Sequence, residues 1–176
     1  MPKYVALLRG INVGGNTMVK METLREVFSS IGFENVRSYI NSGNVAFESK
    51  KTNDEKLAKL ISDAIETGFG KKIAVMVRSA EEIDEIIANN PFDGQFENDK
   101  DLHVFFLADE LTKEQKNLLA SVVSDNEQIE ARGRTLYCLL KISIVDSFVG
   151  KGFIDKKLKI PATARNWRTV KKLAEM

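Results

Sequence analysis

The segment GINVGG at residues 10–15 is the part of the sequence whose residue types come closest to ligand chemistry. It contains three glycines and an asparagine, and only Arg9 separates it from the apolar run at residues 4–8. A glycine-rich loop between a strand and a helix is the common cradle for a phosphate, because its backbone N–H groups can donate to an anion. The candidate ligand-binding residues of this loop and its flanks are Arg9, Asn12, Gly14, Gly15 and Lys20.

The spacing of these glycines differs from both standard nucleotide-binding fingerprints. Asn16-Thr17 follows the last glycine where a P-loop has Lys-Ser/Thr, and the second glycine of Gly-x-Gly-x-x-Gly is displaced. Two interpretations therefore compete. The loop either binds an anion or only needs glycines at positions where φ is positive.

Two further segments supply candidate ligand-binding side chains. Ser42 and Asn44 lie in a tight turn between two predicted strands, where they either line a pocket or only shape the turn. Arg165 and Asn166 open the predicted last helix, over residues 164–175. There they would donate to a carboxylate or phosphate at the helix N-terminus, or they are solvated while Trp167 anchors the helix.

The residue types that most often act in catalysis form no recognisable set. His103 is the single histidine and Cys138 the single cysteine, and each lies in an apolar, strand-like run. Neither has a partner in a known nucleophile–base or zinc-ligand pattern. We therefore expect no metal site and no cofactor, and an enzyme without a recognisable motif stays an alternative.

Charge and composition limit the class of partner. Lys plus Arg is 26 and Asp plus Glu is 25, which argues against a general polyanion binder. A single cysteine fits the reducing cytosol. No secretory leader or membrane-spanning stretch is recognisable. We expect a cytoplasmic protein with no membrane partner, whose ligand is small and anionic or phosphorylated. The sequence carries no signal for an oligomeric state.

Nucleic acid is an alternative partner, because the strands and helices that the sequence predicts form a unit of a kind that can bind RNA. Apolar periodicity over residues 3–79 gives the order β-α-β-β-α-β of a ferredoxin-like unit with an antiparallel sheet. Some sheets of this kind bind RNA through aromatic residues on the free face. Tyr4, Tyr39 and Phe47 lie on the predicted strands of the first half.

The second half repeats part of this order. Residues 102–140 predict β-α-β-β, followed by a helical stretch and by the last helix, capped by Thr163. A helix thus takes the place of the sixth element. We expect one compact domain, with one subdomain over residues 1–90 and a second over residues 91–176.

Four separated motifs resemble one known family. They are residues 8–15, 42–45, 90–92 and 163–167, in that order. Together they resemble the bacterial domain-of-unknown-function family numbered 1697. The resemblance implies an α+β protein of two intertwined ferredoxin-like subdomains with antiparallel sheets, and it implies no activity.

Overall fold

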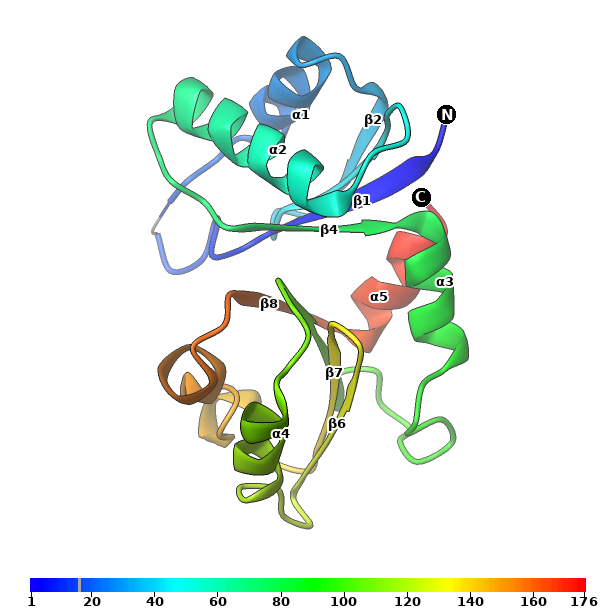
Figure 1. Ribbon diagram of the computed structural model, residues 1–176, viewed down its shortest axis with the longest axis vertical. Helices are drawn as coiled ribbons and strands as arrows, with labels where there is room; N and C mark the ends of the chain where they lie inside the picture. Colours follow the sequence, from blue (N-terminus) through cyan, green and yellow to red (C-terminus); the bar gives the residue numbers. More distant parts are fainter. Residues whose placement is uncertain (16) are drawn as a thin grey trace. The chain divides into compact units, whose positions relative to one another are not determined.

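The computed structural model describes residues 1–15 and 17–176, which form two compact units. The first unit comprises residues 1–85 and 172–176, and the second comprises residues 86–171. Each contains a four-stranded antiparallel sheet that packs against helices (Figure 1). This confirms the expected α+β class with two ferredoxin-like subdomains. The chain changes unit after residue 85, and its last five residues belong to the first unit.

The first unit has the β-α-β-β-α-β order that the sequence predicts. Its sheet has the strand order β2-β3-β1-β4, and α1 and α2 cover one face (Figure 1). Its elements are β1 (Lys3–Leu8), α1 (Met21–Ser30), β2 (Glu34–Tyr39), β3 (Asn44–Glu48), α2 (Asp54–Phe69), β4 (Val75–Ser79) and the larger part of α3 (Ala80–Ala88).

Strand alternation decides which side chains meet α1 and α2. The even-numbered residues of β1 and the odd-numbered residues of β3 are buried against these helices, and the others point to the opposite face. Tyr4 and Phe47 stack in this core with ring centroids 5.7 Å apart. Neither ring therefore lies on the free face that RNA-binding sheets of this kind use.

Side-chain caps set where the helices begin. Ser79 and Glu82 bond each other's backbone N–H groups at the start of α3, the reciprocal pair of bonds that defines a capping box. Residues 52–55, TNDE, fit the capping-box pattern with Thr52 as the cap, but the residue that caps α2 is Asn53, whose side chain accepts from the Lys56 N–H at 2.8 Å. Asparagine and threonine both cap well, so sequence alone does not choose between adjacent candidates.

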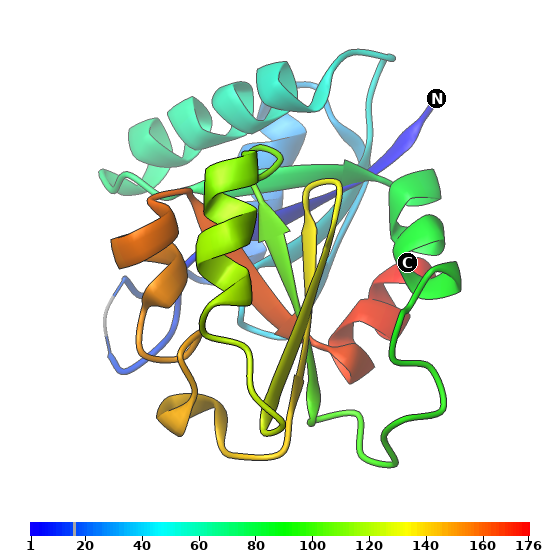
Figure 2. The same cartoon turned by 60° about the horizontal axis from the view of Figure 1, so that its bottom comes forward.

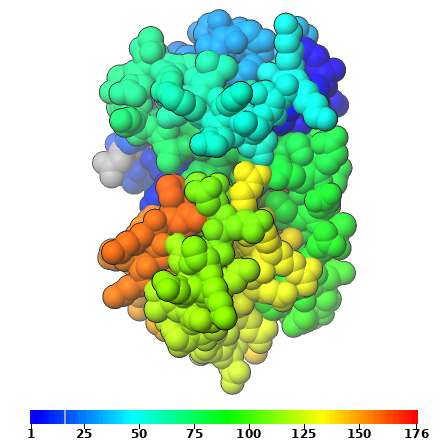
Figure 3. All heavy atoms as spheres, viewed as in Figure 1, coloured from blue at the N-terminus to red at the C-terminus, as the bar shows by residue number. Residues whose placement is uncertain are grey.

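The second unit has the strand order β6-β7-β5-β8 (Figure 2). The residues around position 155, which are orange in Figure 3, form part of the surface of the second unit. Its elements are β5 (Leu102–Leu107), α4 (Lys113–Ala120), β6 (Glu127–Arg132), β7 (Thr135–Leu140), the 3-10 turn η1 (Ile144–Asp146), the π-helical turn η2 (Ile154–Leu158), β8 (Ala162–Asn166) and α5 (Trp167–Ala174).

The sixth element of the second unit is a strand, which corrects the sequence-based prediction. Residues expected to open the last helix form β8, which pairs with β5 so that Ala164 lies opposite Phe105. The helix begins only at Trp167. Pairing with a strand about sixty residues earlier outweighs the local helical pattern.

Among the helices of the described residues, none combines the length and apolar character needed to cross a bilayer.

Candidate functional site

The side chain of Asn12 makes three hydrogen bonds that hold the glycine loop in its conformation. The amide nitrogen donates to the carbonyls of Val19 at 2.9 Å and Asn41 at 2.8 Å, and Oδ1 accepts from the Val19 N–H at 2.7 Å. The backbone of Asn12 has φ +55°, which asparagine adopts more readily than most residues. These bonds support the geometric interpretation of this residue, since a ligand would have to displace them.

The glycine loop meets the hairpin turn that contains Ser42 and Asn44. The Leu8 N–H donates to the Gly43 carbonyl at 2.9 Å, and Gly43 packs directly on Leu8. The buried Asn44 amide donates to Ser42 Oγ at 3.0 Å and to the Tyr39 carbonyl at 3.1 Å. The structure thus brings these two predicted segments together, through bonds that shape the turn.

The remaining loop candidates lie on the surface. Gly14 and Gly15 both have positive φ, and a Cβ added at either would meet no atom within 4 Å. Lys20 is exposed at the start of α1, where its side chain makes no capping bond. Arg9 is exposed and its backbone N–H donates to Ala74. Asn16 lies outside the described residues. Anion binding by this loop stays a prediction.

Arg165 and Asn166 belong to the second unit. Arg165 lies within β8 and is buried, and its guanidinium donates to Thr163 Oγ1 at 2.7 Å and to the Ala164 carbonyl. Burial lowers the pKa of Arg165 to about 10, so the side chain stays charged at neutral pH. Asn166 accepts from the Thr169 N–H at 3.0 Å. Asn166, and not Thr163, therefore caps the last helix.

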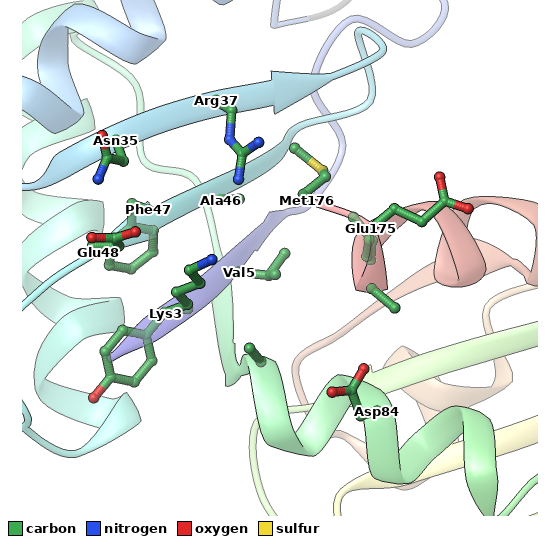
Figure 4. Close-up of a pocket in the computed structure, with 14 residues that line it drawn as sticks. Lys3, Val5, Asn35, Arg37, Ala46, Phe47, Glu48, Asp84, Glu175 and Met176 are labelled. Carbon is green, nitrogen blue, oxygen red and sulfur yellow. The ribbon is translucent and has the colours of Figure 1, made fainter. Parts of the chain in front are cut away.

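A cavity of about 270 Å³ lies on the face of the first sheet opposite α1 and α2 (Figure 4). Val5 and Ala46, paired across β1 and β3, are part of its lining. The far wall comes from α3 and from residues 173–176. All of these residues belong to the first unit. The charged residues of the lining are Lys3, Arg37, Glu48, Asp84 and Glu175.

A β-bulge in the edge strand β2 brings Arg37 to the cavity. Glu34 pairs with Glu48, but Arg37 pairs with Ala46, so β2 has one residue more than β3 over this interval. Asn35 occupies the bulge with φ +49°. The extra residue changes which face of the sheet the following side chains occupy. Without the bulge, Arg37 would point to the face that α1 and α2 cover.

Four charges converge on the cavity without partners of their own. Among the residues that the structure describes, no ion pair or hydrogen bond joins the side chains of Lys3, Arg37, Glu48 or Asp84 to another residue. Glu175 differs, since it bonds Lys172 at 2.7 Å. Figure 4 shows Arg37 over the strands and Asp84 on the helix across from it. Two cations and two carboxylates thus balance around the space.

None of the nine residues predicted from the sequence lines this cavity. The charged residues that line the cavity could have been found from the sequence by looking for charges inside predicted strands. Lys3 and Arg37 stand at strand positions, where a charge normally marks the face that is not packed in a core. The bulge that orients Arg37 has no equally clear signature, and the contribution of α3 depends on the fold.

The single histidine and the single cysteine are neighbours on β5 and β7. His103 lies opposite Cys138 in the strand register. Burial lowers the pKa of His103 and raises the pKa of the Cys138 thiol, so the thiolate nucleophile is disfavoured. In the part of the chain that the structure describes, no three His, Cys, Asp or Glu residues are grouped to hold a metal ion.

The chain belongs to the family described as "Protein of unknown function (DUF1697)", whose sequence profile matches residues 1–137. The motif at residues 163–167 lies beyond this match. A conserved bacterial protein, SP0830, from Streptococcus pneumoniae has a similar solved structure, with a TM-score of 0.79 and 24% identity. The similarity covers 99% of this chain and 97% of that one, and it concerns the fold. No curated protein matches the sequence.

Proposed function

We propose that this DUF1697 protein binds a small ligand with one anionic and one cationic group, of the amino-acid type, in the cavity of the first unit. The observation that carries the proposal is the set of four unpaired charges around it: Lys3, Arg37, Glu48 and Asp84. A simple anion fits less well, because the two carboxylates would repel it. A ligand with both charges meets complementary groups on both sides.

The chemistry of the lining suggests roles for three of the four charged groups. Arg37 presents a planar fork that suits a carboxylate or phosphate, and Lys3 adds a second positive charge. Asp84, on α3, accepts from the ligand's ammonium group. The apolar residues Val5 and Ala46 contact its carbon atoms. A volume of about 270 Å³ lies just below the usual range for ligand pockets, which starts at about 300 Å³, and this favours a small metabolite.

This proposal keeps the anionic group that the sequence led us to expect and moves the site from the glycine loop to the cavity. We propose the cytosol as the compartment, because the single cysteine fits a reducing environment.

The test is a thermal-shift and calorimetric screen with matched triplets of compounds. Each triplet contains an amino acid, the acid that lacks its amino group and the amine that lacks its carboxylate. We expect the amino acid of at least one triplet to bind best and to stabilise the protein by about 2.7 kcal/mol at a hundred times its Kd.

The variant Arg37→Gln tests the site. It should weaken binding of that amino acid by about ten- to a hundredfold, because a hydrogen bond to a charged group contributes about 1.5–3 kcal/mol. Lys72→Gln, an exposed cation outside the lining, is the matched control and should leave affinity unchanged. Equal affinity of Arg37→Gln and the unaltered protein would refute the site, and triplets without any preference would refute the ligand class.

A further inference from the structure

The connection between β7 and β8 concentrates positive charge. Residues 141–161 contain five lysines and two aspartates, a net charge of +3, while the whole chain has +1. The rest of the chain is therefore slightly negative. The lysines of this segment, all exposed, are Lys141, Lys151, Lys156, Lys157 and Lys159. The near balance of the total charge conceals this local excess.

The packing of the segment turns its lysines outward. Phe153, Ile154 and Leu158 are buried in the core of the second unit. Short-range bonds fold the backbone into consecutive turns, such as Lys156 N–H to the Gly152 carbonyl at 2.9 Å. The Gln115 side chain donates to the Leu158 carbonyl at 2.8 Å, which ties the segment to α4. The lysines thus project from a backbone that packing and hydrogen bonds hold in place.

Phe148 adds an exposed aromatic ring to the same segment. It is 40% exposed, and no other phenylalanine or tryptophan among residues 1–15 and 17–176 is exposed to this degree. Its N–H donates to Glu127 Oε1 at 2.7 Å, and its carbonyl accepts from the Phe153 N–H at 3.1 Å. The backbone of Phe148 is therefore held in place while its ring faces solvent.

We propose that residues 148–159 form a binding surface for single-stranded nucleic acid. The lysines meet the backbone phosphates, and the ring of Phe148 stacks on a base, the two kinds of contact that such surfaces combine. The first sheet does not offer this combination, because Tyr4 and Phe47 lie in its core.

An anionic membrane is the other polyanion that lysines attract. Insertion into a membrane needs an apolar face that is available to the lipid. Here the apolar side of η2 is already packed in the protein core, and the exposed apolar side chains of this connection are Phe148 and Val145. The observations therefore favour nucleic acid.

The test measures the affinity of the full chain for a fluorescent single-stranded 20-mer by anisotropy at several salt concentrations. If four lysines contact phosphates, log K should fall with log salt with a slope of about −3, since each contact in a single strand contributes about −0.7. The double variant Lys156→Gln/Lys157→Gln should reduce this slope by about 1.4. The matched double variant Lys50→Gln/Lys51→Gln, in an exposed loop of the first unit, should not change it.

Phe148→Ala should weaken binding about 5- to 150-fold, and Phe148→Tyr should retain it, because stacking on a base needs a ring. Circular dichroism shows whether each variant is folded, and the lysine variants decide the question if Phe148→Ala is not. Three results would overturn the proposal. They are no binding at low salt, an equal loss of slope in the two lysine variants, and binding to phosphatidylglycerol vesicles without binding to the oligonucleotide.

Discussion

Replacing Asn12 by alanine tests whether the glycine loop is held by its own side chains. The substitution removes the three bonds that the amide makes to Val19 and Asn41. If the loop needs these bonds, Asn12→Ala destabilises the fold. If Asn12 instead serves a ligand, the substitution lowers affinity for an anion and leaves stability unchanged.

The size of the effect follows from the geometry of Asn12. A hydrogen bond contributes about 1 kcal/mol net, and one of the three is exposed, so their loss costs about 2–3 kcal/mol. Alanine at φ +55° adds about 1 kcal/mol of backbone strain. Asn12→Ala should therefore lose about 3–4 kcal/mol of unfolding free energy. Asn12→Gly loses the bonds without the strain, so it should be less destabilised than Asn12→Ala by up to about 1 kcal/mol.

Urea denaturation followed by circular dichroism measures these differences through the transition midpoint and its slope. A loss below about 1 kcal/mol for Asn12→Ala would refute the structural role of the side chain. A glycine variant less stable than the alanine variant would contradict the strain argument while leaving the hydrogen-bond argument intact.

Two further predictions concern the packing of each unit. Gly43→Ala should lower the free energy of unfolding, measured by chemical denaturation, by at least about 2 kcal/mol. The new Cβ would lie 2.7 Å from the Cβ of Leu8, and the backbone at Gly43 has φ +88°. Gly94→Ala is the control, because its Cβ would meet no atom within 4 Å and the substitution should cost only the strain of φ +76°. Burial raises the pKa of Tyr137, whose hydroxyl donates to the Ile86 carbonyl at 2.7 Å, to about 12. An unfolded tyrosine ionises near pH 10, so the stability that Tyr137 contributes should be constant below pH 10 and fall between pH 10 and 12. Tyr137→Phe should remove the part of this alkaline loss that comes from Tyr137.

The short-range features of this protein could be predicted from residues close together in sequence. The continuous apolar run of β1 and the apolar periodicity of α1 and α2 gave the order of the first unit. Ser79 and Thr112 each begin a Ser/Thr-x-x-Glu/Gln pattern, and the capping bonds that this pattern predicts are present at both helix starts. These features are readable because each depends on contacts within one or two turns of the chain.

The tertiary structure decided what depends on distant pairing. Residues 162–166 form a strand because β5 offers a partner edge, although their local pattern favours a helix. Arg37 reaches the cavity because a bulge shifts its register against β3. The cavity itself needs three strands, α3 and the last residues of the chain at once. The sequence by itself therefore determined the family, the α+β class and most of the elements. Only the fold decided which charges meet, because burial and register depend on residues far apart in the chain.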